Sequence, residues 1–209
     1  MNCNFNKCYC EHCHSSRNGS VYRVRGQPAK KYGVPVGWSR IGLHTPVQAE
    51  AHDAFAKWHR AYHGTKTHRV ADILKVGHLI RPGNTHFGDI AMGGEEVRVG
   101  HSSNIPEDMT TCIFLSPSFR YAAREAYATP SRYFDDETQT WYYAQVVIKV
   151  LVLPDSYGTC GQSVRTEFTK DPEIEDSEFE WYTKERGSII IYGLLISLQG
   201  SDDGSDSDW

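Results

Sequence analysis

Two apolar runs near the C-terminal end dominate the hydrophobic pattern of this 209-residue chain. Residues 142–153 include Val146, Val147, Ile148, Val150, Leu151 and Val152, and residues 188–198 include Ile189, Ile190, Ile191, Leu194, Leu195 and Ile196. Apolar runs rich in β-branched residues are typical of buried strands. The pattern therefore predicts two long central strands late in the chain.

Apolar residues at helical spacing occur earlier in the chain, over residues 45–62. Thr45 and Pro46, with Gln48, form a capping-box helix start. Apolar residues then recur at steps of three or four positions, at Val47, Ala51, Phe55, Trp58 and Tyr62. This spacing predicts one amphipathic helix that buries those side chains.

Shorter elements fill the middle of the chain. A second helix is predicted over residues 67–75, where Val70, Ile73 and Leu74 point inward, and it ends at Gly77. A short buried strand is predicted over residues 112–115, followed by a helix from Ser118 to about residue 128. Because helices come early and the long strands late, we expect an α+β fold.

Four zones are visible along the chain. We expect residues 1–20 to form a Cys/His knuckle, residues 21–44 a basic, Gly/Pro-containing connecting segment, residues 45–199 a compact domain, and residues 200–209 a disordered acidic tail. Within the compact domain, residues 80–110 lack periodicity and contain several glycines, which predicts a long loop.

The bulk properties exclude some classes of function. No run approaches the ~18 consecutive apolar residues that a membrane span needs, and the start of the chain lacks the pattern of a secretory signal. We therefore expect an intracellular protein with no membrane partner. The formal net charge of -4 argues against broad binding along a phosphate backbone.

Cysteines concentrate at the N-terminus. Cys8, Cys10 and Cys13 offer three soft ligands, and either Cys3 or His14 could supply a fourth. Four such ligands are typical of a closed structural zinc site, and free or oxidised thiols are the alternative. Nearby basic residues make nucleic-acid binding conceivable, but a solvated basic linker is the favoured interpretation of these residues: Arg17, Arg23, Arg25, Lys30 and Lys31.

Three short segments carry the remaining chemical signal. They are residues 62–65 (Tyr-His-Gly-Thr), residues 112–118 (Cys-Ile-Phe-Leu-Ser-Pro-Ser) and residues 178–182 (Glu-Phe-Glu-Trp-Tyr). The helix expected after the second segment carries Tyr121 and Tyr127. In this order the segments resemble the catalytic domain of the poly(ADP-ribose) polymerase and diphtheria-toxin branch of ADP-ribosyltransferases, over residues 55–199. The N-terminal part, with its cysteine cluster and the sequence Tyr-Gly-Val-Pro-Val-Gly-Trp at residues 32–38, also resembles the C-terminal region of neuralized-like proteins.

The ADP-ribosyltransferase resemblance implies two packed, mainly antiparallel sheets with flanking helices, and NAD as co-substrate. It implies that His63 bonds the adenosine ribose, that the Gly64 backbone holds the nicotinamide amide, and that Glu180 is the catalytic carboxylate. Tyr127 is the preferred ring for stacking on nicotinamide, with Tyr121 in reserve. The other residues that it assigns to NAD binding are Thr65, Phe114, Ser116 and Ser118.

Two departures from the family pattern bear on the activity. Phe114 stands where the family strand has tyrosine, so this position cannot donate a hydrogen bond. Glu178 and Glu180 form a Glu-x-Glu pair, which on an extended segment would point to one side. Glu178 is then either acceptor-facing, as in toxins that modify arginine, or a solvated acid.

The resulting hypothesis is a monomeric, NAD-dependent mono-ADP-ribosyltransferase that modifies a protein or nucleic-acid acceptor. The alternatives are an NAD glycohydrolase on the same scaffold, a catalytically inactive zinc-containing binding module, and a zinc-dependent nucleic-acid adaptor that does not use NAD. A fold resemblance alone does not choose among them.

Overall fold

The computed structural model describes residues 1–17, 19–79, 81, 109, 111–162 and 171–200. Its elements give an α+β fold in which the sheets are antiparallel and the helices short. Apart from Arg81 and Met109, the loop predicted over residues 80–110 lies outside the described residues, as does almost all of the predicted tail. No helix among the described residues is both long and apolar enough to cross a membrane.

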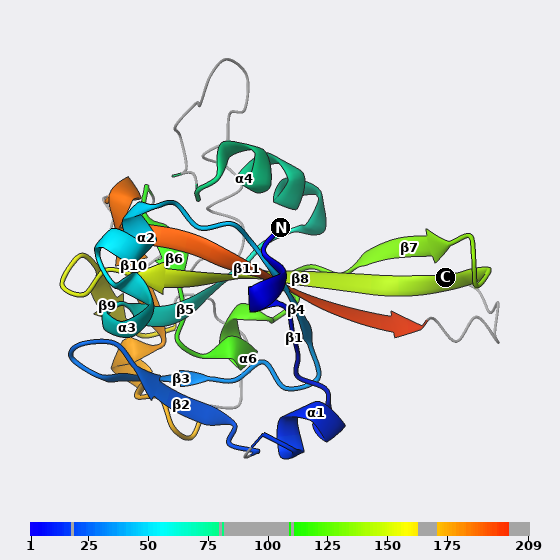
Figure 1. Ribbon diagram of the computed structural model, residues 1–209, viewed down its shortest axis with the longest axis horizontal. Helices are drawn as coiled ribbons and strands as arrows, with labels where there is room; N and C mark the ends of the chain where they lie inside the picture. Colours follow the sequence, from blue (N-terminus) through cyan, green and yellow to red (C-terminus); the bar gives the residue numbers. More distant parts are fainter. Residues whose placement is uncertain (18, 80, 82–108, 110, 163–170, 201–209) are drawn as a thin grey trace.

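The two predicted long strands are confirmed and form the centre of the main sheet. They are β8 (Thr140–Val152) and β11 (Ile189–Gly200), which pair from Ile189↔Val152 to Gly200↔Tyr142 with a bulge between Ile191 and Gly193. β5 (His59–Gly64) continues the sheet beside β8, and β4 (Ser39–Gly42) and β1 (Lys7–Cys8) continue it beside β11. β7 (Ser131–Asp135) pairs with the other end of β8, and together they project from the body as an arm (Figure 1).

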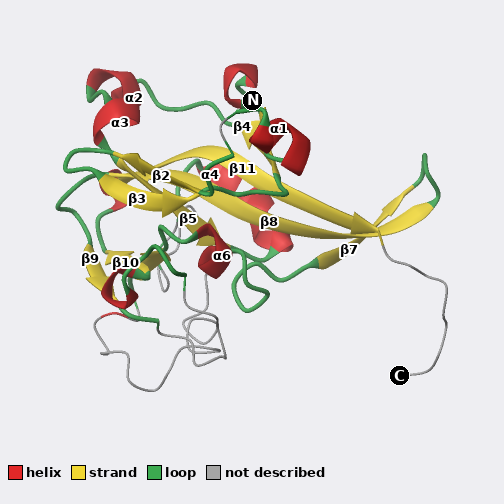
Figure 2. Cartoon of the chain, turned by 90° about the horizontal axis from the view of Figure 1, so that it is seen from below, coloured by secondary structure: helices red, strands yellow, loops and turns green. Residues whose placement is uncertain are grey.

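Two smaller sheets flank the main one. β6 (Ile113–Leu115), β10 (Glu180–Thr183) and β9 (Gly158–Cys160) form a three-stranded sheet with β10 in the middle. β2 (Tyr22–Arg25) and β3 (Lys30–Gly33) form a hairpin. Figure 2 shows α2 (Gln48–Ala51) and α3 (Ala54–Lys57) on one side of the long strands, and β9 and β10 on the other.

The alternation of β8 divides the core between the two faces of the sheet. Ile148, Val150 and Val152 pack with Leu115 of β6, Trp181 of β10 and Ile73 of α4 (Val70–Val76). Val147 faces the other way and packs with Tyr32 of the hairpin and with α6 (Phe119–Ala122), while Leu151 packs with Trp58 near α3. Both faces of β8 are therefore buried, which explains its nearly continuous apolar run.

The helix predicted from residue 45 to residue 62 is wrong. Two single-turn helices, α2 and α3, occupy part of this stretch, and Asp53 between them has a positive φ of 50°. β5 begins at His59, and Val47, expected to be buried, is 79% exposed. Trp58 and Tyr62 are buried as expected, but they reach the core from extended backbone rather than from one helical face.

The second predicted helix is largely confirmed. The 3₁₀ turn η2 (Thr67–Arg69) leads into α4, which ends at Gly77 with a φ of 81°. Ile73 is buried as predicted, whereas Leu74 is exposed. The helix predicted from Ser118 exists, but α6 stops at Ala122 and turns follow.

The two N-terminal zones contribute strands to the same sheet as the compact domain. β4, from the segment predicted to be a connection, pairs directly with β11. β1, from the Cys/His knuckle, pairs with β4 through Lys7–Arg40 and Cys8–Ser39. The remaining elements of the described residues are the helix α1 (Glu11–Ser15) and the 3₁₀ turns η1 (Cys3–Phe5), η4 (Asp176–Glu178) and η5 (Arg186–Ser188).

Candidate functional site

A buried carboxylate forms the centre of the candidate site. Glu180, the first residue of β10, is 2% exposed. Its Oε1 accepts hydrogen bonds from the hydroxyl groups of Tyr121 and Tyr127, the latter at 2.9 Å. The two hydroxyls are also 2.6 Å apart. Side chains from the second and third sequence segments therefore meet at one carboxylate oxygen.

Burial and the Glu180 carboxylate act together on both tyrosines. Loss of solvent raises the pKa of Tyr121 and of Tyr127, and the nearby negative charge of Glu180 raises each pKa further. Both phenols therefore remain protonated at neutral pH and can donate to Glu180. Glu180 is therefore an acceptor held in place by two donors.

Serine side chains fix the segment that carries the tyrosines. Ser118 caps α6 by accepting from the Tyr121 amide at 3.2 Å, which is the role its sequence position predicts. Its hydroxyl donates to Asp171 at 2.6 Å. Ser116 donates to the Phe179 carbonyl at 2.6 Å and so ties β6 to the start of β10. Both serines are fully engaged in holding the protein itself.

The histidine of the first segment lies on the neighbouring strand. His63 on β5 is partly exposed, and its Nδ1 is 2.9 Å from the carbonyl oxygen of Phe114 on β6. Desolvation lowers the pKa of His63, so the neutral ring is favoured. A carbonyl only accepts, so Nδ1 carries the proton and Nε2 is the acceptor.

The glycine of this segment is needed for packing within the protein. A Cβ at Gly64 would meet the carbonyl oxygen of Ala122 and would lie 2.6 Å from Cβ of Tyr127. The sequence predicts that a ligand approaches this backbone, whereas the structure brings the Tyr127 turn against it. Thr65, next along the chain, is 7% exposed.

Glu178 does not share a side with Glu180. It ends the 3₁₀ turn η4, and Phe179 has helical dihedrals (φ -63°, ψ -39°), so the extended alternation expected for residues 178–180 is wrong. Glu178 forms an ion pair with Lys30 of the hairpin. It is therefore held at the surface, while Glu180 turns inward.

Three of the predicted metal ligands come together. The sulfur atoms of Cys8, Cys10 and Cys13 lie within 4.8 Å of one another, so this group could hold a metal ion. The Cys10 amide donates to the Cys8 sulfur at 3.4 Å, which lowers the pKa of Cys8 by favouring its thiolate. The structure brings neither Cys3 nor His14 into the group.

The two candidates for a fourth ligand occupy different surroundings. Asn2, beside Cys3, bonds to Gly42, three residues along β4 from the partner of Cys8, a separation of about 10 Å in a strand. His14 is adjacent to Cys13 on α1 and is 5% exposed. Its Nε2 is buried without a hydrogen-bond partner among the described residues. A buried polar atom of this kind requires an explanation, and an absent ion is one of them.

Sequence reasoning missed two features. Asp171 looks like a solvated acid in an acidic stretch, but it is 4% exposed and accepts from Tyr22 and Ser118. Lys149 is 3% exposed in the middle of β8. A lone charge within the run Val146–Val152 was the available signal for Lys149, whereas nothing local distinguishes Asp171 from its neighbours.

None of the protein-family models compared with the chain matches it. A functional assignment therefore depends on the order of the three sequence segments and on the geometry of Glu180, Tyr121 and Tyr127.

Proposed function

We propose that this protein is an NAD-dependent mono-ADP-ribosyltransferase with an ADP-ribosyltransferase fold. The observation that carries the proposal is the meeting of Glu180 with Tyr121 and Tyr127, since motif order alone predicts that these residues act together. The three-stranded sheet packed on the main antiparallel sheet is consistent with the proposed fold. The acceptor is a protein or a nucleic acid.

The proposed reaction needs a group that stabilises positive charge on the ribose. The bond between ribose C1′ and nicotinamide breaks with its electron pair moving to nicotinamide, and C1′ passes through a positively charged, oxocarbenium-like state. A fixed carboxylate stabilises that charge, which is the role proposed for Glu180. An acceptor nucleophile then bonds to C1′ and loses its proton.

The remaining residues would bind and orient NAD. His63 presents an acceptor nitrogen suited to a ribose hydroxyl, because Nδ1 is committed to Phe114. Tyr127 remains the proposed stacking ring, since it packs against Gly64 while Tyr121 is 2% exposed. Phe114 would form a wall of the nicotinamide pocket through its ring alone.

The test is NAD turnover by Glu180→Gln. Glutamine retains the size of the side chain and an oxygen that accepts from both tyrosines, so the fold is preserved while the charge is lost. We expect nicotinamide release to fall about 100-fold or more, as for loss of a transition-state charge contact, with NAD binding retained. Glu173→Gln, which removes an exposed ion pair with Lys31, is the matched control.

Mass spectrometry of the products distinguishes the alternatives. A mass gain on an acceptor that depends on Glu180 establishes the transferase. Release of nicotinamide with only free ADP-ribose favours the NAD glycohydrolase. Unchanged turnover in Glu180→Gln contradicts the proposed role, and absence of turnover with any acceptor favours a binding module.

We also propose that the metal held by Cys8, Cys10 and Cys13 is zinc, with His14 as the fourth ligand. Thiolates at about 2.3 Å from zinc lie about 3.8 Å apart, so the observed sulfur positions need only a small contraction. A zinc ion would also explain the unpartnered His14 Nε2. Metal content should approach one zinc per chain and fall in His14→Asn but not in Cys3→Ser; the reverse pattern contradicts the choice of His14.

A further inference from the structure

A buried lysine lies on the face of the main sheet that the hairpin covers. Lys149 is 3% exposed, and its ammonium lies over three aromatic rings. The distances from Nζ to the ring centroids are 5.7 Å for Tyr9, 5.2 Å for Tyr32 and 5.2 Å for Tyr62. The aromatic faces favour a positive charge at this point, which is unusual for the middle of an apolar strand.

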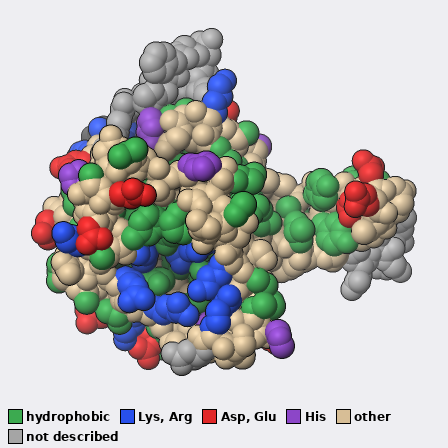
Figure 3. All heavy atoms as spheres, viewed as in Figure 1, with side chains coloured by type: hydrophobic (Ala, Val, Ile, Leu, Met, Phe, Trp, Pro, Cys, Tyr) green, Lys and Arg blue, Asp and Glu red, His purple; other side chains and the backbone are tan. Residues whose placement is uncertain are grey.

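Four more cations converge on this lysine. The charges of Arg40, Arg60, Lys7 and Arg23 all oppose the charge on Lys149, and together with burial, the larger cause, they lower its pKa well below the usual value. These five residues come from five strands, β4, β5, β1, β2 and β8, and are called the basic cluster below. Figure 3 shows Lys and Arg side chains gathered around a hollow on this face.

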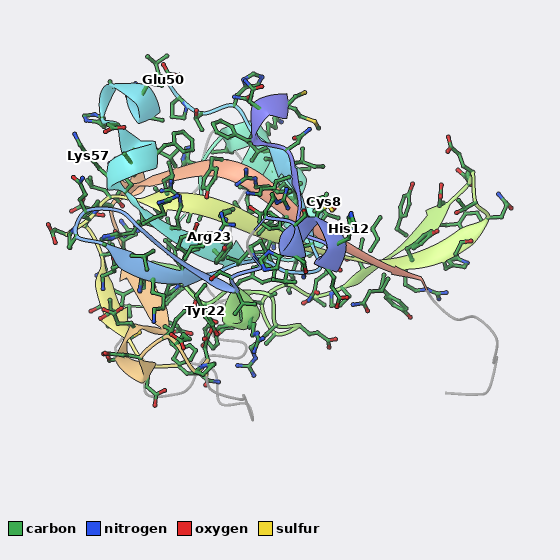
Figure 4. The ribbon with its side chains drawn as sticks, turned by 60° about the horizontal axis from the view of Figure 1, so that its bottom comes forward. Cys8, His12, Tyr22, Arg23, Glu50 and Lys57 are labelled. Atoms are coloured by element: carbon green, nitrogen blue, oxygen red, sulfur yellow. The ribbon has the colours of Figure 1, made fainter. Side chains whose placement is uncertain are left out.

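The hairpin supplies one wall of the hollow. Figure 4 shows Arg23 on the side of the hairpin that faces the main sheet, whereas its neighbour Tyr22 lies toward α6. Tyr22 is held there by its hydrogen bond to Asp171. Because neighbouring residues of a strand point in opposite directions, fixing Tyr22 also fixes Arg23 over the sheet.

No acid compensates the cluster among the described residues. The described residues form two ion pairs, Lys30–Glu178 and Lys31–Glu173, and neither includes a residue of the basic cluster. Arg40 donates to the Phe5 carbonyl at 2.6 Å, and Arg60 donates to the carbonyls of Trp58 and Phe55. Like charges brought together in partial burial destabilise the fold, so an anion bound among them would stabilise it.

A glycine makes room for the cluster. Gly193 pairs with Lys149 on one side and with Gly42 of β4 on the other. A Cβ at Gly193 would lie 2.7 Å from Cδ of Arg40 and 3.6 Å from Cβ of Lys149. The absent side chain therefore lets Arg40 lean across β11 toward Lys149.

We propose that the basic cluster binds the terminal phosphate of a small phosphorylated ligand, such as a phosphate monoester or a pyrophosphate. A dianion matches several converging cations better than a single negative charge does. A terminal phosphate is favoured over a nucleic-acid backbone because Lys149 is 3% exposed, so only a compact group joined on one side can approach it. The proposal does not depend on the NAD chemistry proposed above.

Binding of the phosphate should also lead to protonation of Lys149. An anion beside Lys149 favours the ammonium form and raises the lowered pKa of this residue. The groups that face Lys149 are the rings of Tyr9, Tyr32 and Tyr62 and the other four cations of the basic cluster. At a pH above the pKa of Lys149 in the unliganded protein, binding should therefore be accompanied by uptake of a proton by Lys149.

The experiment is calorimetric titration of the full chain with inorganic pyrophosphate, in two buffers of different ionisation enthalpy. We expect binding, with proton uptake visible as a buffer-dependent heat. Lys149→Met and Arg40→Gln should each weaken binding by about tenfold or more, since each removes a charge-assisted contact. Lys75→Met, an exposed lysine on α4, is the matched control and should bind normally.

Thermal unfolding separates binding from folding. Lys149→Met should melt at or above the temperature of the unmodified chain, because a buried charge is replaced by an apolar side chain of similar length. Pyrophosphate should raise the melting temperature of the unmodified chain but not of this variant. Absence of pyrophosphate binding overturns the proposal, as does equal binding by Lys149→Met. Tighter binding of an oligonucleotide without a terminal phosphate overturns the choice of ligand.

Discussion

At the scale of single residues, Glu180 determines the chemistry of its neighbours. Cys160 lies directly opposite Glu180 in the β9–β10 pair, and its thiol donates to Glu180 Oε2 over 3.9 Å. Burial, followed by the negative charge of Glu180, raises the pKa of Cys160 to about 12. The thiolate is therefore disfavoured, although the side chain is only partly buried.

This pKa predicts the order in which the cysteines react. At about pH 8 only ~1 in 10⁴ of Cys160 thiols is ionised, so iodoacetamide should modify exposed Cys3 well before Cys160. Reactivity of Cys160 should rise as the pH approaches 12. In Glu180→Gln the charge that raises the pKa is removed, so Cys160 should react faster. Peptide mapping by mass spectrometry measures both effects, and equal rates for Cys3 and Cys160 would contradict them.

The candidate site was predictable only in part at this scale. Motif order predicts Glu180, Tyr121 and Tyr127 as a group, and the structure brings them into contact across a separation of 59 residues. The positions of Glu178 and Asp171 were not predictable, because one depends on a single 3₁₀ turn and the other on a partner 149 residues away.

At the scale of elements, the conformation of Asp53 explains why the apolar periodicity before β5 wrongly predicted one continuous helix. Its dihedrals, φ 50° and ψ 41°, are left-handed, and its side chain makes no capping hydrogen bond to α3. This single residue ends one helical turn and begins another, after which Trp58 to Tyr62 are all buried. Helical spacing and a strand buried on both faces give similar apolar patterns over a few residues.

A pair of substitutions tests this reading of Asp53. Asp53→Gly should be tolerated, because glycine adopts a left-handed conformation without strain. Asp53→Val should lower the free energy of unfolding by about 1–2 kcal/mol relative to the glycine variant, since its branched Cβ opposes that conformation. Urea unfolding measures both variants. Equal stability of the two would mean that the chain passes residue 53 in another conformation.

The long strands were the elements most open to prediction. β8 and β11 carry nearly continuous apolar runs because both faces of their central parts are covered. β9 and β10 are short, and they pair with segments that are distant in the sequence, whereas β7 forms a partly exposed hairpin with the adjacent strand β8. The fold class could therefore be predicted, but most of the pairing could not.

At the scale of the whole molecule, the N-terminal region is built into the core. Tyr9 is 4% exposed and packs with Tyr32, Tyr62 and Val147. The strand before it, β1, extends the main sheet beyond β4. Residues 1–20 therefore contribute a core residue and a strand of the main sheet in addition to the three clustered cysteines.

This integration predicts the result of a deletion. A chain that begins at residue 21 should lose several kcal/mol of unfolding free energy, because removal of one buried aromatic side chain alone costs about 3–5 kcal/mol. Tyr9→Phe, which keeps the ring, is the milder control and should lose much less. The midpoint of urea unfolding measures the effect. An unchanged midpoint for the deleted chain would instead support an independent knuckle.

β5 joins the two candidate sites through consecutive residues. Tyr62 faces the ammonium of Lys149, and His63 faces the carbonyl of Phe114 on the opposite side. Both placements depend on one alignment with β8, in which Tyr62 lies opposite Lys149 and His63 opposite Ile148. A slip by one position would exchange the two faces, placing the imidazole among cations and the phenol against β6. Both sites would then be lost in a single misfolding event.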